Sequence, residues 1–412
     1  MHDKDIIRDL AKRYADIAAA PRNDSLRRLW RDHLSLRHTR VPVIAVIGPW
    51  DAWVQDYLDK NLRCTDPFLR ELESQLHVRL LTADFNDDTI FEPWLPCPAV
   101  EPVPWSHSWG LPFPAEHLET RGTAAKVLPA LPDIHDLSQL RAPAHVYDEA
   151  ATERKAAAWH DALDGILPFE VTRTPLGSFG ADISSVVAKL RGIEQVMVDM
   201  LEEPEALHRL LAFMRNAVLA NQAVGTAAGH WTLASHFNQI MTYAHELPAP
   251  APNSGPVPTT QLWFHCAAQE FTGVSPAMHD EFLLQYQKPI MEQFGLILYG
   301  CCEDLSRKID ILRQVRNIRT IAISPMLDTA GLARCAEQIG TDYAMSWRPN
   351  PADCVCNSWN PERVEKNLRA GFEVTRGTHR HIDLKDIHTV QGDVSRIRKF
   401  CTLARRLSEE YE

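Results

Sequence analysis

The chain has 412 residues, of which 45% are hydrophobic and 24% charged, a composition typical of a globular protein and unlike that of a disordered or fibrous one. The formal net charge of −11 disfavours nucleic acids and anionic membranes as partners, because both attract basic surfaces. No stretch approaches the ~18 consecutive apolar residues of a membrane-spanning helix, and the charged start lacks a signal-peptide core. We therefore expect a cytoplasmic protein. Its nine cysteines, an odd number, fit reduced thiols better than a disulfide framework.

The first part of the chain is expected to flank the main fold. Residues 1–40 have the spacing of two amphipathic helices. The continuous apolar run at 41–47, which ends at Gly48-Pro49, is typical of a strand buried on both faces. Residues 88–150 are rich in proline and tryptophan and weak in periodicity. Together with the first strand they make up a segment, 41–150, in which a long insertion wraps the fold and does not form a separate domain.

From residue 160 to 412, candidate strands alternate with helical patterns. With the first run they number eight, at residues 41–47, 166–172, 231–235, 261–265, 296–299, 319–323, 342–346 and 381–384. Eight βα units favour a closed parallel sheet, so we predict an α/β fold, a (β/α)8 TIM barrel, as a single domain over residues 1–412. An open doubly wound sheet is the alternative, but no glycine-rich phosphate loop follows the first strand.

In such a barrel the chemistry takes place just after the C-terminal ends of the strands. The substrate-binding candidates at these strand ends are Trp50, Asp51, Phe179, His236, Asn238, Gln269, Tyr299, Trp347 and Arg348. The aromatic members would form apolar walls that exclude water. Arg348 could clamp a carboxylate or phosphate through its two-pronged donor geometry, or it could form an ion pair that stabilises its own loop.

The sequence Tyr-Gly-Cys-Cys-Glu-Asp at 299–304 is the strongest single feature. Thiolate and imidazole ligands from separate strand ends suit an open tetrahedral zinc site, and we predict zinc ligands at His265, Cys301 and Cys302. Such a zinc would acidify a thiol substrate or polarise a leaving group. The alternative is that both cysteines are small buried residues at a crowded strand end.

Catalytic acid–base candidates are Glu270, Glu303, Asp182 and His388, which also follow predicted strands. A carboxylate in a dry pocket works as a general acid or base when its pKa is raised, and a histidine titrates near neutral pH. The alternative for the carboxylates is a helix N-terminal position favoured by the helix dipole. For His388 it is a structural role.

Several blocks resemble one known family. The segment 269–328 contains QEFTGVSP and FGLILYGCCEDLSRKIDILRQVRNIRTIAISP followed by an aspartate, and it resembles proteins of the uroporphyrinogen-decarboxylase superfamily. SWRPNPA at 346–352, LKDIHTVQGD at 384–393 and RCTDPFLRELESQL at 63–76 look like other blocks of the same group. The resemblance therefore runs nearly end to end. It implies the barrel fold, an active site at the barrel mouth and a homodimer.

Within that superfamily the chain resembles the corrinoid-linked methyltransferases. The resemblance implies transfer of a methyl group from a small methylated donor to a corrinoid protein or a thiol acceptor. Cobalamin would come from a separate corrinoid protein, because no cobalamin-binding motif of the Asp-x-His-x-x-Gly type occurs in this chain. True uroporphyrinogen decarboxylases carry an arginine-rich segment after the first strand. Residues 48–53 contain no arginine, so tetrapyrrole decarboxylation is not expected.

The chain departs from the zinc-dependent members of the family. Those carry His-x-Cys at the exit of the fifth strand, where this chain has Tyr299 and Cys301, and their later cysteine is missing near Ser346-Trp347. The metal site is then either rebuilt with neighbouring side chains or absent. Two other functions stay open: a decarboxylase or other lyase with Arg348 and Lys385 as carboxylate anchors, and a barrel that binds a ligand without catalysis.

Overall fold

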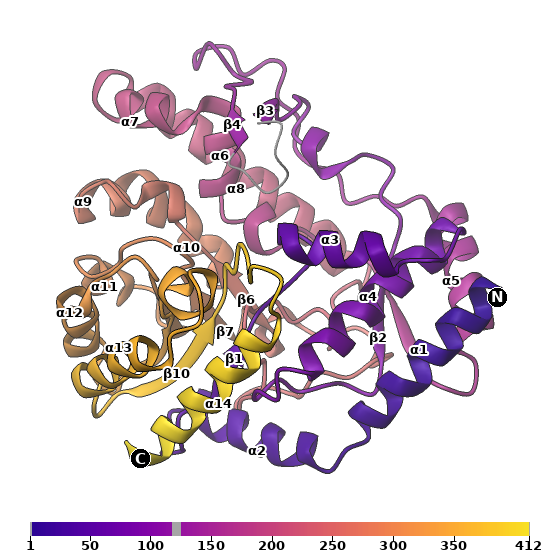
Figure 1. The fold of residues 1–412 in the computed structure, drawn as a ribbon. Helices are drawn as coiled ribbons and strands as arrows, with labels where there is room; N and C mark the ends of the chain where they lie inside the picture. The colour runs from indigo at the N-terminus through magenta and orange to yellow at the C-terminus, as the bar shows by residue number, and fades with distance from the viewer. Residues whose placement is uncertain (1, 118–124, 412) are drawn as a thin grey trace.

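The centre of the molecule is a curled parallel sheet of six strands, in the order β1-β10-β9-β8-β7-β6. The computed structural model describes residues 2–117 and 125–411 (Figure 1). The six strands are β1 (Val43–Ala45), β6 (Trp263–Cys266), β7 (Leu296–Tyr299), β8 (Ile318–Ile323), β9 (Ala344–Trp347) and β10 (His379–Leu384). All six coincide with predicted strands to within a few residues, so the predicted α/β fold with a parallel sheet is confirmed.

The two remaining predicted strands do not join this sheet. Residues 166–172 contain β5 (Phe169–Thr172), which pairs in parallel with β2 (Leu95–Pro98) as a separate two-stranded sheet. β2 belongs to the proline-rich insertion, where no strand is expected from the sequence pattern. In the described part of the chain, the sheets are therefore one of six strands, one of two, and a short antiparallel pair of β3 (Ala115–His117) and β4 (Ala125–Val127).

The prediction of a strand at 231–235 is wrong, because this segment forms a turn. The Ser235 hydroxyl oxygen accepts a hydrogen bond from the Thr232 N–H at 3.1 Å, and the Ser235 N–H donates to the Thr232 carbonyl at 2.9 Å. Serine and threonine compete in this way for the backbone groups that a strand ladder needs. The chain still passes along the edge of the sheet, since the Phe237 N–H donates to the Trp263 carbonyl of β6 at 3.0 Å.

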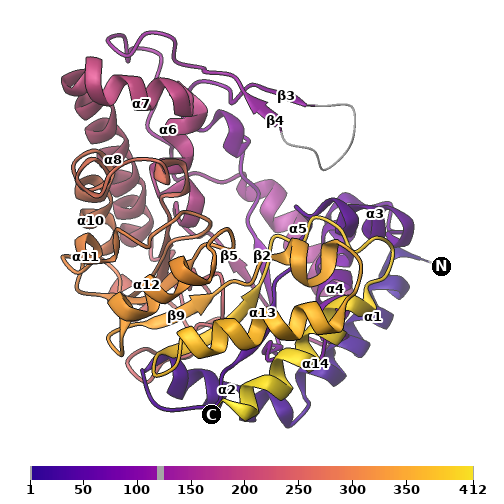
Figure 2. The ribbon, with the colours of Figure 1, turned by 60° about the vertical axis from the view of Figure 1, so that its left-hand side comes forward.

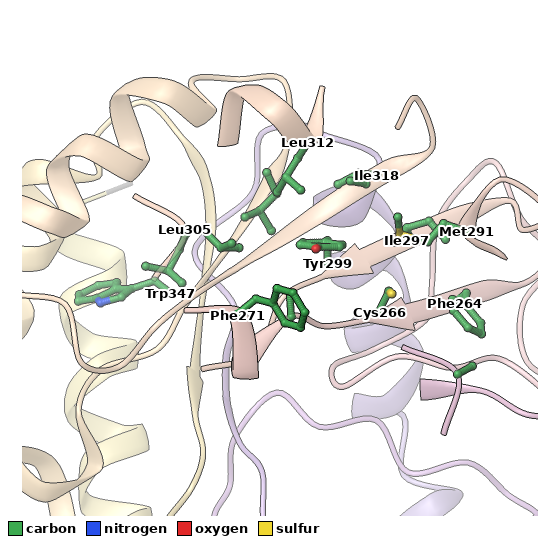
Figure 3. Close-up of a cluster of buried hydrophobic side chains, with 14 of the residues drawn as sticks. Phe264, Cys266, Phe271, Met291, Ile297, Tyr299, Leu305, Leu312, Ile318 and Trp347 are labelled. Atoms are coloured by element: carbon green, nitrogen blue, oxygen red, sulfur yellow. The ribbon is translucent and has the colours of Figure 1, made fainter. Parts of the chain in front are cut away.

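Alternate residues of the six strands face two different cores, as the period of two in a β-strand requires. On the outer face, Cys266, Tyr299 and Trp347 belong to a large hydrophobic core shared with the surrounding helices, part of which Figure 3 shows. On the inner face, Trp263 and Leu298 pack in a smaller core against helix α2 (Arg22–Leu34). The face to which a strand-end side chain points therefore decides which other side chains it can share a site with.

Helices cover the outer face of the sheet. Among the helices that contribute to the large core are α8 (Pro204–Ala227), α10 (Gln285–Met291), α12 (Thr329–Ile339), α13 (Pro361–Val374) and α14 (Ser395–Glu410). The start of α13 follows a local signal, because the Asn360 side chain accepts from the Arg363 N–H and Pro361 occupies the first helical position. Among the described residues, no helix combines the length and apolar character needed to cross a membrane.

The N-terminal helices and the insertion lie beside the main sheet (Figure 2). Helix α1 (Asp3–Ala18) packs with α4 (Pro67–Ala83) and α5 (Glu149–Leu163) around a core of their own, so the two predicted N-terminal helices, α1 and α2, are confirmed. The insertion anchors itself through Trp109, which is fully buried and meets Phe213 of α8 edge-on. The remaining helices are α3 (Ala52–Asn61), α6 (Ser184–Arg191), α7 (Ile193–Glu202), α9 (Pro276–His279) and α11 (Ile309–Leu312).

Candidate active site

A cysteine thiolate paired with a lysine forms the centre of the candidate site. Cys301 follows β7 and is only 3% exposed, and its Sγ lies 3.3 Å from Nζ of Lys385, which follows β10. The Gln239 side-chain amide approaches the same sulfur at 3.7 Å, and the Cys302 sulfur lies 3.6 Å away. Cys301 belongs to the predicted zinc motif, whereas Gln239 lies in a loop and was not predicted from the sequence as a site residue.

The surroundings of Cys301 favour its ionised form. The hydrogen bond with the Cys302 thiol, together with the cationic Arg348 and Lys385, outweighs burial and lowers the pKa of Cys301 to about 5. The pKa of Cys302 is raised, because its proton is shared with the Cys301 sulfur and because the thiol is buried. The two sulfurs therefore hold one proton between them near neutral pH. A thiolate, not a thiol, is the reactive species of cysteine.

Arg348 holds the residues of this cluster in place through hydrogen bonds. Its side chain is 0% exposed and forms an ion pair with Asp383, Nε to Oδ2, at 3.0 Å. Its two terminal nitrogens donate to the Cys301 carbonyl at 2.5 Å and to the Gln239 side-chain oxygen at 2.8 Å. All three edges of the guanidinium are thus taken by the protein. Arg348 positions Cys301 and Gln239, and of the two roles predicted for it the structure shows the structural ion pair.

The open side of the cluster carries two aspartates. Asp386 Oδ2 lies 3.3 Å from the Cys302 sulfur, and its Oδ1 lies 3.7 Å from Lys385 Nζ. Asp51, which follows β1, accepts the Gly48 N–H at 2.9 Å. Burial, with Asp386 adding repulsion, raises the pKa of Asp51 to about 6 despite that hydrogen bond. Asp51 and Lys385 therefore place a carboxyl group and an amino group, each able to accept or donate a proton, at the mouth of the sheet.

His265 does not face the thiols with a free nitrogen. Its Nδ1 lies 2.8 Å from the Ser178 hydroxyl, and its Nε2 lies 3.2 Å from the Gly300 carbonyl. A carbonyl only accepts, so Nε2 carries the proton and Nδ1 accepts from Ser178. Complete burial lowers the pKa of His265 to about 3, which keeps the ring neutral. The ring supports the turn that presents Cys301.

The predicted zinc ligands do not fit zinc in this arrangement. Both His265 nitrogens are engaged, and the Lys385 ammonium occupies the side of Cys301 that a cation would take. Both oxygens of Glu303 accept backbone N–H groups, from Ala268 and Cys301, each at 2.7 Å. Within residues 2–117 and 125–411, no three His, Cys, Asp or Glu side chains are grouped so as to hold a metal ion. Zinc stays a prediction from sequence.

The acids Asp182 and Glu270 lie in a different place, among the helices. Asp182 accepts from the Ser185 N–H and hydroxyl, both at 2.9 Å, and Glu270 accepts from the Ser184 hydroxyl at 2.6 Å. Complete burial, together with the charge of Glu270, raises the pKa of Asp182 well above its usual range. Ile183, between Asp182 and Ser184, has φ +63° and ψ −45°, a strained conformation for a β-branched residue. Neither acid contacts the thiol cluster.

Tyr299 and Trp347, predicted as pocket walls, face the outer core. The Tyr299 hydroxyl donates to the Gln287 side chain at 2.9 Å, and Gln287 in turn donates to the Asp182 carbonyl at 2.6 Å. Trp347 packs on Gly371 of α13, where an added Cβ would come within 2.0 Å of the indole. The period of two along β9 places Trp347 opposite Arg348, and after β7 the turn at Gly300, whose φ is +99°, separates Cys301 from the face of Tyr299, so that neither ring lines the mouth.

The other substrate-binding candidates do not form one group with the thiols. Phe179 meets the His265 ring edge-on, and the half-buried His236 accepts the Trp263 N–H through Nδ1. Burial lowers the pKa of His236 to about 4. Asn238 and Gln269 are half-buried, and Trp50 is 68% exposed. The acid–base candidate His388 is exposed at the surface.

A cavity of about 620 Å³ lies between the insertion and the segment after β5. Its walls are mainly apolar and aromatic, and the aromatic members are Trp105, Tyr147, Phe179 and Phe237. Its inner end reaches Ser178, the residue that is hydrogen-bonded to His265. The cavity therefore ends one side chain away from the turn of Cys301. Sequence patterns gave no sign of it, because its walls come from segments far apart in the chain.

Comparison with known proteins finds no family model that matches the chain and no similar curated protein.

Proposed function

We propose that the protein is a methyltransferase, with Cys301 as the group that takes a methyl from a small methylated donor and passes it to an acceptor. The observation that carries this proposal is the thiolate of Cys301, held by Lys385, Cys302 and Gln239 at the C-terminal edge of the sheet. A buried, stabilised thiolate is a soft nucleophile suited to attack on a methyl carbon. The resemblance to uroporphyrinogen-decarboxylase-like methyltransferases, described above, points to the same reaction.

In the first step the Cys301 sulfur attacks the methyl carbon, and the bond from that carbon to the donor's oxygen, nitrogen or sulfur breaks. The leaving atom keeps the electron pair and receives a proton, for which the nearby Lys385 and Asp51 are the candidates. In the second step the acceptor's nucleophile takes the methyl, and Cys301 leaves again as a thiolate. The contacts that lower the pKa of Cys301 also make it a good leaving group.

Two further features belong to the proposal. The first is the closed (β/α)8 barrel, in which β5 and the segment around 231–237 would take the places of the second and third strands beside the six-stranded sheet. The second is the acceptor, a corrinoid carried by a separate protein or a thiol. A reduced corrinoid would supply a strongly nucleophilic cobalt. The exposed Trp50 and Met326, each just beyond a strand of the sheet, offer an apolar rim for such a partner.

The decarboxylase alternative is weaker on this geometry. It needs Arg348 to anchor a substrate carboxylate, and that guanidinium is already bound to Asp383, Gln239 and the Cys301 carbonyl. Lys385 alone would remain as an anchor, beside the anionic Cys301.

The test uses methyl-labelled donors of three kinds, namely thioethers, phenol ethers and methylamines, with reduced cobalamin as the acceptor. Cleavage after Glu292 and Glu303 releases the peptide 293–303, whose only cysteines are Cys301 and Cys302. We expect labelled methyl on Cys301 before the acceptor is added and methylcobalamin afterwards. Cys301→Ala should abolish both signals, whereas Cys335→Ala, a buried cysteine of α12, should retain them. Turnover by Cys301→Ala, or no turnover with any of the donors, would contradict the proposal.

A further inference from the structure

The two adjacent thiols of the candidate site are placed for reversible oxidation. Their sulfurs lie 3.6 Å apart, close to van der Waals contact. Cys302 is partly exposed at the mouth, and the Cys301 sulfur, in a residue that is 3% exposed, lies directly beside it. Seven other cysteines, at 64, 97, 266, 335, 354, 356 and 401, are all buried. The pair is therefore the point at which a small oxidant from solvent reaches a thiol.

We propose that Cys301 and Cys302 form a peroxide-sensitive dithiol, in which a hydroperoxide oxidises Cys301 and Cys302 then closes a disulfide with it. The inference concerns the thiols alone and does not rest on the proposed methyl transfer. Three contacts carry it: the distance between the two sulfurs, the Lys385 ammonium at 3.3 Å from Cys301, and the Asp386 carboxylate at 3.3 Å from Cys302.

Each contact has a part in the reaction. The Cys301 thiolate attacks the outer oxygen of the hydroperoxide, and the O–O bond breaks. Cys301 becomes a sulfenic acid, and Lys385 protonates the departing alkoxide to an alcohol. The Cys302 sulfur then displaces the hydroxyl of the sulfenic acid, which leaves as water, while Asp386 accepts the Cys302 proton and passes it on. The dithiol loses two electrons and two protons in all, and one hydroperoxide is reduced to one alcohol and one water.

The disulfide would be easy to reduce again. Neighbouring Cα atoms across a trans peptide lie about 3.8 Å apart, whereas unstrained disulfides join Cα atoms at roughly 4.4–6.8 Å. A bond between adjacent cysteines is therefore strained, and strained disulfides are the readily reduced, regulatory ones. Oxidation also removes the negative charge that faces Lys385. The oxidised site thus differs in charge from the reduced one and returns to it with a thiol reductant.

The molecule contains its own control. Cys354 and Cys356 are separated by a single residue and are both buried in the outer hydrophobic core. They are released together, as the only cysteines of the peptide 338–362, by cleavage after Glu337 and Glu362. Proximity in sequence is similar for the two pairs, but only Cys301 has the ammonium of Lys385 beside its sulfur.

The experiment treats the intact protein with one equivalent of hydrogen peroxide, alkylates the free thiols and measures both peptides by mass spectrometry. We expect peptide 293–303 to lose two hydrogen atoms and to regain both thiols with dithiothreitol. Its thiols should disappear about tenfold or more faster than those of peptide 338–362, because a thiolate reacts and a thiol does not. In Cys302→Ser, Cys301 should accumulate as a sulfenic acid that dimedone traps. Lys385→Gln should slow the oxidation, and Lys385→Arg should restore its rate.

Three results would overturn the proposal. One is a peptide 293–303 that keeps both thiols under conditions that oxidise peptide 338–362. Another is direct conversion of Cys301 to sulfinic acid with no disulfide. The third is a disulfide between two chains in place of one between neighbours. The peptide masses are read without any methyl donor, so that failure of the proposed methyl transfer and failure of the dithiol are separate outcomes.

Discussion

The attraction between Lys385 and Cys301 is the interaction on which the candidate site depends most directly, and it can be removed by one substitution. The Nζ–Sγ distance is 3.3 Å. At this distance Coulomb's law corresponds to about 1.3 kcal/mol in water and about 5 kcal/mol at an effective dielectric constant of 20. Lys385 is mostly buried, with 12% of its side chain exposed, so the value lies between these limits. Lys385→Gln removes the charge and keeps a polar side chain that is one bond shorter.

The expected result is a less acidic Cys301. Each 1.36 kcal/mol corresponds to a tenfold change in the thiolate equilibrium, so the midpoint should move upwards by roughly one to four pH units. Since the pKa of Cys301 is about 5 in the native protein, that of the variant should lie roughly between 6 and 9. The remaining stabilisation comes from the Cys302 thiol and Arg348, which the substitution leaves in place.

The assay is the rate of alkylation of peptide 293–303 by iodoacetamide between pH 4 and pH 9, with the protein folded during the reaction. Lys385→Arg should keep the native midpoint, because it keeps the charge. Lys399→Gln is the matched surface control, since Lys399 lies on α14 with about half of its side chain exposed and pairs with Asp393. If Lys385→Gln titrates at the native midpoint, the ammonium does not stabilise the thiolate and the argument for the site is refuted.

Three further predictions concern stability. The pKa of Asp51 is about 6 in the folded chain and near 3.9 in an unfolded one, so its protonated form stabilises the fold at low pH and that contribution is lost as the pH rises through 6. In urea unfolding, Asp51→Asn should therefore be up to about 3 kcal/mol more stable than the native protein at pH 8 and equally stable at pH 4. An equal gain at both pH values would contradict this. Arg348→Met leaves Asp383 buried and unpaired and should lower the free energy of unfolding by about 3–5 kcal/mol. The double variant Arg348→Met/Asp383→Leu should restore much of this loss. Simple additivity of the two single variants would show that the residues are not coupled. Gly371→Ala improves helix propensity but places a Cβ against Trp347, so we expect a net loss of about 1–3 kcal/mol in thermal unfolding, reduced when Trp347→Phe makes room.

Much of the fold could be predicted from local patterns. Six of the eight predicted segments formed the six strands of the main sheet, because strands covered on both faces are mostly apolar. β10 is the exception, since it carries the buried polar residues His381 and Asp383. The run at 231–235 has similar residues but forms a turn, since Thr232 and Ser235 satisfy its backbone groups locally. The strand β2 was missed because its Leu-Pro-Cys-Pro sequence lacks the residues that favour strands. Its pairing with β5 is a contact between distant segments.

The site could be predicted only in part. Cys301, Arg348 and Lys385 were found because they follow strands, and the structure does bring them together. Tyr299 and Trp347 also follow that rule of position, yet they point to the other face. The alternation along β9 could have shown this for Trp347, and the alternation along β10 could have indicated Asp383, two residues before Lys385 on the same face. For Tyr299 it could not, because Tyr299 and Cys301 are two residues apart and only the turn at Gly300 separates them.

What the sequence determined by itself is the set of segments that become buried strands and capped helices, since burial and capping depend on residues close together in the chain. It also determined that reactive residue types follow β7, β9 and β10. Only the tertiary structure decided their chemistry. Besides Cys302 and Arg348, Lys385 lowers the pKa of Cys301 and is 84 residues away from it, and the tautomer of His265 is set in part by Ser178, which is 87 residues away. Charge and hydrogen bonding act through space, and neither distance can be read from the spacing of residues along the chain.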